Sequence, residues 1–196
     1  MLFDRIRVIT ASGLLFFFFY FISIYSVLAI NTEGIPPIIN YDSKDYNGSN
    51  KVYQIIQDTN QIIFASTTNN IIVFDGNHWQ SIPVNGNPCF DLHNGEIYVG
   101  AYNDFGKIQF IENKGYAFVS LNNPENNLGQ VNSIYSFQNK VYVATSRDVF
   151  VYSNKELELV ESYDEPVSLY CSGKNLYLLI TNAGLFKLKN NQFVEA

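Results

Sequence analysis

The stretch Glu96 to Gly106, EIYVGAYNDFG, contains the pattern on which the rest of the chain is built. A β-branched and aromatic run is followed by two small residues and then by a polar turn that ends in glycine. This composition is typical of a strand that leads into a tight turn. The pattern returns three times, so one supersecondary unit is repeated. The other copies are IIFASTTNN (62–70), VYVATSRD (141–148) and LYLLITNAG (176–184).

Alignment of the four copies divides most of the chain into four units. Each unit has four short runs of strand-forming residues separated by turn residues, and Asn94-Gly95 in the second unit is a strong signal for a two-residue hairpin. The second and third runs are almost continuously apolar, whereas the fourth run is more polar. The units cover residues 52–84, 88–121, 131–163 and 166–196.

Four-stranded units that repeat roughly every 35–45 residues are typical of β-propeller blades. Middle strands are apolar on both faces when a blade packs between two neighbours, whereas outer strands meet water. We therefore predict an all-β fold, a β-propeller of about four antiparallel four-stranded blades. A stacked β-solenoid is the alternative. Within the propeller, Gly100 and Ala101 should allow close packing, and Trp79 should pack between blades.

Residues 1–30 differ from everything that follows. Two arginines precede an apolar run that extends from Val8 to Ile30 and ends in small residues. This order is typical of an export signal peptide, and the run is also long enough to be an uncleaved membrane anchor. Both alternatives place the later residues outside the cytoplasm. Residues 31–51 are rich in proline, glycine and polar residues, and we expect an extended lead-in there.

Charge and cysteine content exclude some functions. The formal charge is −6, and lysine and arginine do not cluster. A partner such as nucleic acid is therefore excluded, because binding it requires a basic face that displaces phosphate counterions. Cys89 and Cys171 fall on the first strands of non-adjacent units, too far apart for a disulfide. We expect both to be small buried hydrophobic residues.

One run could carry chemistry in the first unit, Asp75-Gly76-Asn77-His78-Trp79. His78 and Trp79 could act as a sugar-stacking or acid–base pair, but Asp75-Gly76 also suits a turn, which we favour. His93 lies beside a predicted turn and should be solvated. With only two histidines and two cysteines, which do not have the spacing of a zinc-ligand set, no zinc site can be assembled.

Acidic residues are the remaining candidates. Asp104 with Glu96 or Glu112 could form the paired carboxylates of a glycoside hydrolase, but a role of Asp104 in a turn explains this residue without chemistry. A group of glutamates in the third unit should form one solvated strand face. We predict no catalytic, cofactor-binding or metal-binding residues, and the ligand-binding residues stay unassigned. The glutamates are Glu156, Glu158 and Glu161.

Nearly all of residues 34–196 resembles the two-component regulator propeller family, more loosely after about residue 130. The chain departs from the family at Val52-Tyr53, where relatives more often have tryptophan. The motifs that carry the resemblance are Gly34-Ile35-Pro36 with Asn40-Tyr41 and Asp45-Tyr46, Phe74-Asp75-Gly76 with Trp79, and Ile97-Tyr98-Val99-Gly100 with Asp104-Phe105-Gly106.

The resemblance implies an exported, ligand-binding sensor domain of a bacterial hybrid histidine kinase or triple-tyrosine-domain regulator, on the periplasmic side of the inner membrane. Relatives continue with further blades, a β-sandwich, a membrane helix and an output domain. We therefore expect this chain to be the N-terminal fragment of such a regulator, with a complete four-bladed protein as the alternative. The expected partners are an unknown small ligand, with an oligosaccharide as one candidate, the rest of the regulator, and a second copy in a full-length homodimer. No cofactor is expected.

Three functions fit these observations. We predict a non-catalytic sensor, in which a ligand has different affinities for two arrangements of a dimer. A secreted propeller enzyme acting on glycans is the first alternative, and it would need histidines or carboxylates gathered at one mouth of the channel. The second is a scaffold that binds a protein through its loops, for which the loop 122–130 is the obvious site.

Overall fold

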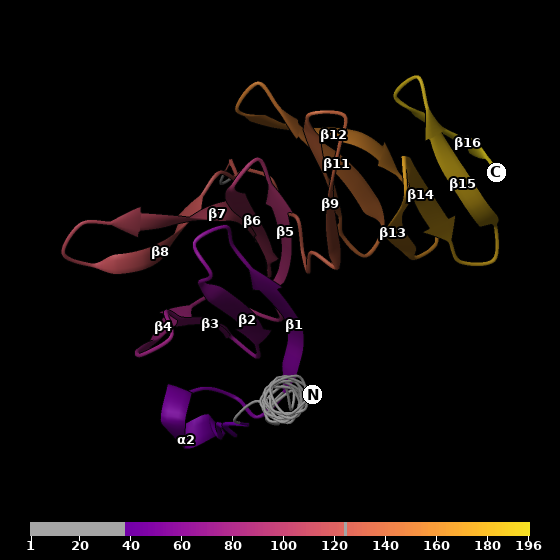
Figure 1. Cartoon of the computed structure of the whole chain (residues 1–196). Coiled ribbons are helices and arrows are strands. Elements are labelled where there is room, and N and C mark those ends of the chain that lie inside the picture. Colours follow the sequence, from indigo (N-terminus) through magenta and orange to yellow (C-terminus); the bar gives the residue numbers. More distant parts are fainter. Residues whose placement is uncertain (1–37, 124) are drawn as a thin grey trace, which may run out of the picture. The chain divides into compact units, whose positions relative to one another are not determined.

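The computed structural model describes residues 38–123 and 125–196 of the chain. The chain divides into two units, and the second, Tyr41–Ala196, is described almost completely (Figure 1). The predicted signal peptide or anchor, residues 1–30, lies outside the described residues. Within the part of the chain that the structure describes, no helix is long and apolar enough to span a membrane.

The second unit consists of four antiparallel sheets of four strands, which we call blades 1 to 4, with the strands of each blade adjacent in sequence order. The predicted all-β propeller of four-stranded blades is therefore confirmed. Blade 1 contains β1 (Val52–Gln57), β2 (Ile63–Thr67), β3 (Asn70–Phe74) and β4 (Trp79–Pro83). Blade 2 contains β5 (Cys89–His93), β6 (Glu96–Ala101), β7 (Asp104–Ile111) and β8 (Gly115–Ser120). Blade 3 contains β9 (Ser133–Phe137), β10 (Lys140–Ala144), β11 (Asp148–Ser153) and β12 (Glu156–Ser162). Blade 4 contains β13 (Val167–Ser172), β14 (Asn175–Ile180), β15 (Gly184–Lys189) and β16 (Gln192–Glu195).

Successive blades pack face to face because their second strands are apolar on both sides. In β6, Val99 lies in the core between blades 1 and 2, whereas Tyr98 lies in the core between blades 2 and 3. In β10, Val143 faces blade 2 and Tyr142 faces blade 4. Neighbouring residues of a strand point to opposite faces of the sheet. The continuous apolar runs of the sequence therefore supply two cores at once.

Tight turns and one close contact in blade 2 follow the sequence pattern. Asn94 and Gly95 have φ angles of 51° and 79°, the left-handed conformation at both centres of a type I′ hairpin turn. A Cβ atom on Gly100 would lie 2.3 Å from Cγ1 of Val131, inside van der Waals contact. Ala101 is buried. The expected close packing at Gly100 and Ala101 is confirmed.

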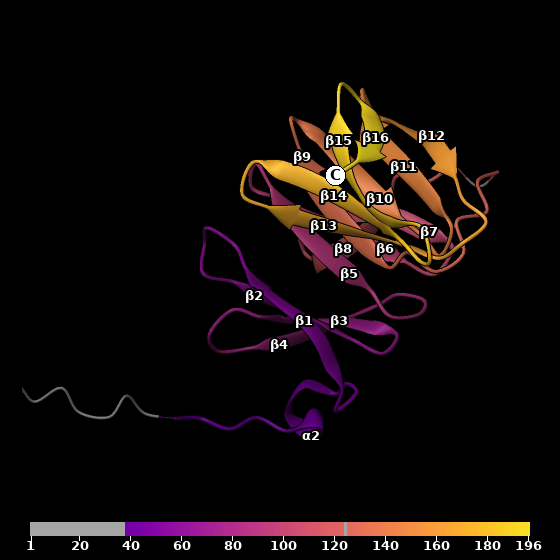
Figure 2. The same cartoon turned by 90° about the vertical axis from the view of Figure 1, so that its right-hand side faces the viewer.

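The first strands of the blades lie next to one another in order, β1, β5, β9 and β13 (Figures 1 and 2). Because they belong to different sheets, no ladder of main-chain hydrogen bonds joins them. Side chains reach across to the main chain of the next blade instead. These links are Gln54 to Phe90 (2.8 and 3.0 Å), Asp91 to the N–H of Ser136 (2.7 Å) and Ser133 to the N–H of Leu169 (3.2 Å).

The lead-in contains one short helix, α2 (Ser43–Tyr46), where we expected extended chain. Asp42 accepts a hydrogen bond from the N–H of Lys44, and the Asp45 carboxylate accepts one from the N–H of Asp42. This reciprocal capping box stabilises a helical turn too short to show a helical period in the sequence. Asn47, with a left-handed φ of 50°, ends the helix.

Trp79 packs against the lead-in, so the prediction that it packs between blades is wrong. Its ring stacks on Phe74 with 4.2 Å between centroids. The rings of Tyr41 and Tyr46 lie 5.0 and 5.6 Å from it. Trp79 pairs with Phe74 across β3 and β4, on the face opposite to Val73, which lies in the core shared with blade 2. The lead-in thus covers part of the outer face of blade 1.

We expect Gly100→Ala to lower the free energy of unfolding by about 1–3 kcal/mol, because the added methyl group overlaps Val131. Chemical denaturation checks this. Gly95→Ala is the comparison: no atom lies within 4 Å of a Cβ there, and its positive φ alone should cost about 1 kcal/mol. An unchanged stability of Gly100→Ala would show that the blades do not approach each other here.

Tyr46→Ala should shift the fluorescence emission of Trp79 to longer wavelength, because the removed ring shields the indole from water. Trp79 is the only tryptophan of the chain, so the signal is unambiguous. Loss of the aromatic contact should also cost about 0.5–1.5 kcal/mol. Tyr102→Ala, an exposed tyrosine on blade 2, serves as control and should leave the emission unchanged. An identical shift in both variants would contradict the lead-in contact.

Candidate functional site

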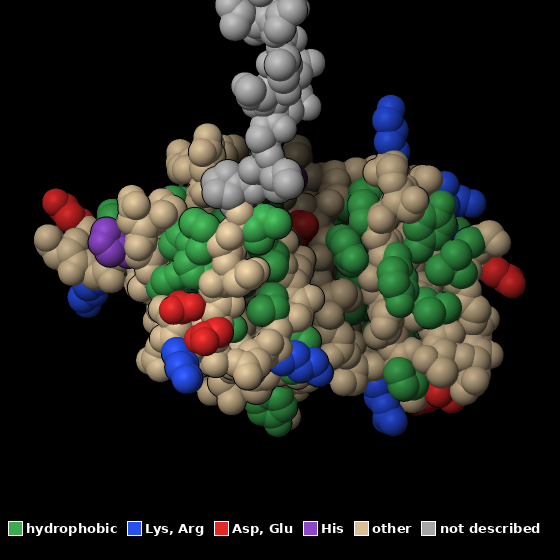
Figure 3. All heavy atoms as spheres, turned by 60° about the horizontal axis from the view of Figure 1, so that its bottom comes forward, with side chains coloured by type: hydrophobic (Ala, Val, Ile, Leu, Met, Phe, Trp, Pro, Cys, Tyr) green, Lys and Arg blue, Asp and Glu red, His purple; other side chains and the backbone are tan. Residues whose placement is uncertain are grey.

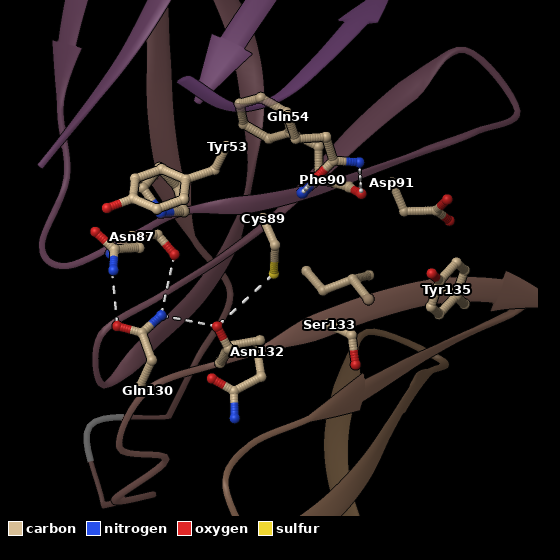
Figure 4. A pocket seen from close by; sticks show the side chains of 13 residues that line it. Tyr53, Gln54, Asn87, Cys89, Phe90, Asp91, Gln130, Asn132, Ser133 and Tyr135 are labelled. Carbon is tan, nitrogen blue, oxygen red and sulfur yellow. Dashed lines mark hydrogen bonds between the residues drawn. The ribbon is translucent and has the colours of Figure 1, made fainter. Parts of the chain in front are cut away.

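A cavity of about 380 Å³ lies against the first strands of blades 1, 2 and 3 (Figure 4). Its walls come from β1, from residues 87–91 and from residues 130–135. Small-molecule sites of proteins have volumes of roughly 300–1,000 Å³. The cavity is therefore large enough for a ligand of a few rings, and we refer to it as the inner pocket.

Gln130 holds together the two linkers that border the inner pocket. Its Nε2 donates hydrogen bonds to the carbonyl oxygens of Asn87 (3.0 Å) and Val131 (2.8 Å). Gly86 has a φ of +77°, and a Cβ there would lie 2.5 Å from Oε1 of Gln130, so only glycine fits beside this side chain. A single β-bridge between Tyr102 and Gln130 adds a main-chain tie.

Two further side chains of the pocket wall are engaged in contacts between blades. The Gln54 amide both donates to and accepts from the main chain of Phe90, as a neighbouring strand would. The Asp91 carboxylate accepts a hydrogen bond from the N–H of Ser136, 2.7 Å away. The pocket wall is therefore made of groups that also fix how blades 1, 2 and 3 pack.

Two amides of the pocket are available for a ligand. Among the described residues, the side-chain amides of Asn87 and Asn132 have no hydrogen-bond partner. Figure 4 shows both residues near the side chain of Gln130. Tyr53, 41% exposed, presents its ring at the pocket, with its hydroxyl 3.2 Å from Thr68. These groups offer neutral donors, neutral acceptors and an aromatic face.

The pocket is almost uncharged. Asp91 carries the only formal charge among the described residues that line it, and that carboxylate is bonded to the next blade. Burial raises the pKa of Tyr135, which therefore remains a neutral phenol. Such a lining suits an uncharged polar ligand better than an anion, which would require lysine or arginine.

Cys89 lines the pocket but is not a nucleophile. Burial raises the pKa of its thiol to about 12, so it stays protonated at neutral pH. Its Sγ lies 3.8 Å from the carbonyl oxygens of Gly100 and Val131. Both cysteines are free thiols; Cys171 is exposed and Cys89 is half-buried, so the expectation that both are buried is wrong for Cys171 and only partly met by Cys89. Cys171 lies near the end of β13, next to the turn into β14.

The run from Asp75 to Trp79 forms a turn, which is the interpretation that the sequence favoured over a sugar-stacking or acid–base pair. Asp75 Oδ1 accepts hydrogen bonds from the N–H groups of His78 (2.7 Å) and Asn77 (2.8 Å), and these bonds lower the pKa of its carboxyl group. The His78 side chain is exposed, with Nδ1 3.5 Å from Asp75. Trp79 belongs to the aromatic cluster under the lead-in. These residues do not line the inner pocket.

The structure does not bring Glu96 and Asp104 together. Glu96 begins β6 and Asp104 begins β7, at opposite ends of one hairpin. Lys107 and Tyr98 both donate hydrogen bonds to Glu96 and lower the pKa of its carboxyl group. Asp104 accepts a bond of 2.6 Å from the hydroxyl of Ser120. Each carboxylate is thus used within blade 2.

The other titratable candidates lie on the surface. His93 Nε2 is 3.0 Å from the amide of Asn94, beside the hairpin turn. The three glutamates of β12 are exposed, and their register places them on one face of blade 3, as expected. Among residues 38–123 and 125–196, no group of three histidine, cysteine, aspartate or glutamate side chains could hold a metal ion.

The loop 122–130 is packed onto blade 2 over its second half. Leu128 is 2% exposed, and its N–H bonds to Oδ1 of Asn103 at 2.8 Å. The main-chain N–H of Asn103 in turn donates a hydrogen bond to the carbonyl oxygen of Gly129, 2.6 Å away. This half of the loop stabilises the junction between blades 2 and 3, and it leads directly into the pocket wall at Gln130.

Sequence reasoning left the ligand-binding residues unassigned, and the inner pocket was not found. Asn87 and Gln130 lie in linkers between repeat units, 43 positions apart, and no local pattern joins them. The available signal was the position of Asn87, Gln130 and Asn132 in the linkers directly before the first strands of blades 2 and 3.

No protein-family model matches the chain, and no curated protein matches it. Solved structures do. The extracellular domain of a one-component system, BT4673 of B. thetaiotaomicron, matches 82% of the chain with a TM-score of 0.63 and 18% identity. The extracellular domain of a hybrid two-component system, BT3049 of the same organism, matches 75% with a TM-score of 0.56 and 12% identity. The chain shares the fold of these extracellular domains. It spans 23% and 22% of their respective lengths.

We expect the two thiols to react very differently with iodoacetamide at pH 8. The exposed Cys171 should be labelled rapidly, whereas Cys89, with its raised pKa of about 12, should react only after unfolding. Mass spectrometry should therefore find one label on the native protein and two after denaturation. In Cys171→Ser the native label should disappear. Rapid labelling of Cys89 in that variant would contradict the raised pKa of its thiol.

Proposed function

We propose that this chain is the N-terminal part of an extracytoplasmic, non-catalytic propeller that senses a small ligand for a membrane-bound two-component or transcriptional regulator. The inner pocket carries this proposal, because three blades contribute to one neutral, polar and aromatic cavity. The matched structures are extracellular domains of one- and two-component systems, which supports export and a periplasmic location. The remaining blades, a β-sandwich, a membrane helix and an output domain would belong to the longer regulator.

The lining of the pocket favours an uncharged, polyhydroxylated ligand such as a segment of an oligosaccharide. The free amides of Asn87 and Asn132 can each donate and accept hydrogen bonds with hydroxyl groups. The ring of Tyr53 lines the pocket with the Lys51 ammonium 4.7 Å from its centroid, and it leaves one ring face on which a sugar can pack. Asp91 is the only charged residue among the described residues of the lining, and its carboxylate is hydrogen-bonded to the N–H of Ser136. The pocket therefore offers little charge to attract a charged ligand.

A ligand in this pocket would act on the packing of the blades. Gln54, Asp91 and Gln130 line the pocket and also bond to the main chain of a neighbouring blade or linker. A ligand that binds one arrangement of these groups more tightly shifts the population toward it. In a full-length homodimer, that difference in affinity would be passed through the membrane helix to the output domain.

We also propose that the chain does not catalyse a reaction. The thiol of Cys89 is protonated, and each of the carboxylates Glu96 and Asp104 is bonded within its own blade. Incubation of the purified protein with polysaccharides should therefore release no product. Time-dependent release of sugars that Asn132→Ala abolishes would favour a glycan-degrading propeller instead.

The sensing proposal predicts that Asn132→Ala weakens ligand binding about three- to tenfold, the effect of removing one or two neutral hydrogen bonds. Isothermal titration calorimetry against a panel of neutral oligosaccharides measures this. Asn77→Ala is the matched control, because Asn77 is also exposed but lies in the turn between β3 and β4, outside the pocket. Equal affinities of the two variants and the parent for every sugar that binds would contradict a site at the inner pocket.

A further inference from the structure

A second cavity, of about 500 Å³, lies between blades 1 and 2. Its walls come from the turn between β2 and β3, the linker after β4, the start of β7 and one ring of β8. We call it the linker pocket. Its volume is within the range of small-molecule sites in proteins, and none of the described residues lines both this cavity and the inner pocket. Its polar lining residues are Asn69, Asn85 and Asp104.

The polar side chains of the linker pocket have hydrogen-bonding capacity to spare. Asp104 uses Oδ1 for two hydrogen bonds within blade 2, and its Oδ2 has no partner among the described residues. Asn69 accepts a hydrogen bond from the N–H of Gly86 (3.0 Å) with its Oδ1, and no described group accepts from its Nδ2. The exposed amide of Asn85 is unpaired within the described chain. The pocket therefore offers a carboxylate oxygen and amide groups, beside the ring of Phe118.

A single residue separates the two pockets along the linker. Asn85 lines the linker pocket and Asn87 lines the inner pocket. Two residues of extended chain span at most about 7 Å, a distance comparable with the repeat of a glycan chain. Gly86 between them is bonded to Asn69, and a Cβ atom on it would lie 2.5 Å from Oε1 of Gln130. The partition between the pockets is thus, at this point, a residue without a side chain.

Tyr102 is exposed beside this partition. A Cβ atom on Gly86 would lie 2.8 Å from the Cβ of Tyr102, and the N–H of Tyr102 donates a hydrogen bond of 2.8 Å to the carbonyl oxygen of Asn85. The main chain of Tyr102 is thereby fixed against the linker, yet the residue is 56% exposed. A tyrosine in this situation offers an apolar ring and a polar hydroxyl to a ligand that crosses the linker.

We propose that the linker pocket is a second subsite for the ligand of the inner pocket, and that this ligand is an extended glycan which crosses the linker at Gly86 beside Tyr102. The free oxygen of Asp104 accepts hydrogen bonds from sugar hydroxyls, and such bonds to a charged group are stronger than neutral ones. Asn69 and Asn85 bind further hydroxyls. This inference rests on the proposed function, because the first subsite is the inner pocket.

The charges of the two linings favour a neutral glycan over an acidic one. Asp91 and Asp104 are the only formally charged residues among the described residues of both linings, and both are acidic. Uronic acids and sulfated sugars require arginine or lysine for strong binding. The face of the molecule in Figure 3 carries scattered charges of both signs and no large basic patch.

The test is calorimetric titration of the full chain with cello-, xylo-, manno- and malto-oligosaccharides, from disaccharides to octasaccharides. In a series that binds, the affinity should rise at least about tenfold between the length that fills the inner pocket and the length that also reaches the linker pocket. Affinities that do not depend on length would overturn the second subsite and leave the inner pocket as the site.

Asp104→Asn should weaken the long glycans about three- to tenfold and leave the shortest ones unchanged, because asparagine keeps the Oδ1 acceptor and loses only the charged oxygen. Asp148→Asn is the matched control. Asp148 also begins the third strand of its blade, but it lies outside both pockets. Equal affinities of the two variants for long glycans would overturn the role of Asp104.

Asn132→Ala separates this inference from the proposed function, since it should weaken glycans of every length. If short glycans bind through Asn132 and Asp104→Asn weakens no glycan, only the second subsite is overturned. If no series binds at any length, both proposals are overturned together.

Discussion

The packing of one blade on the next is the constraint on which this structure depends. Each second strand places an aromatic residue on one face and aliphatic residues on the other, as Tyr98 and Val99 do in β6. A sheet that is apolar on both faces gains stability from each face that another element covers. The lead-in covers part of the outer face of blade 1 with Tyr41 and Tyr46, whereas blade 4 keeps its outer face exposed.

The candidate site follows from the same arrangement. First strands of adjacent blades lie side by side without sharing a sheet, so polar side chains such as Gln54 and Asp91 connect them. Gln130 connects the linkers before blades 2 and 3 in the same way, by a hydrogen bond to Asn87. The inner pocket lies next to this connection, between blades 1, 2 and 3. The groups that bind a ligand here and the groups that hold the blades together are therefore neighbours in one wall, which is a physical basis for a sensor.

The fold was predictable because its signals are local and repeated. Asn94-Gly95 required a hairpin and Gly100 a close contact, and both occur. The site was not predictable, because Gln130 and Asn87 meet only after two blades have packed. For Trp79, the strand was predictable from the sequence but its packing partner was not. The layer that covers its ring depends on a lead-in helix that a local capping box stabilises.

Native-state amide hydrogen exchange across a denaturant series tests the packing account most directly. Blades 2 and 3 are covered on both faces, so the amides of β6 and β10 should exchange only through global unfolding. The amides of β14, in a blade with one exposed face, should exchange through a smaller opening with a weaker dependence on denaturant. Equal protection and equal denaturant dependence for β10 and β14 would contradict the claim that coverage of both faces stabilises each blade.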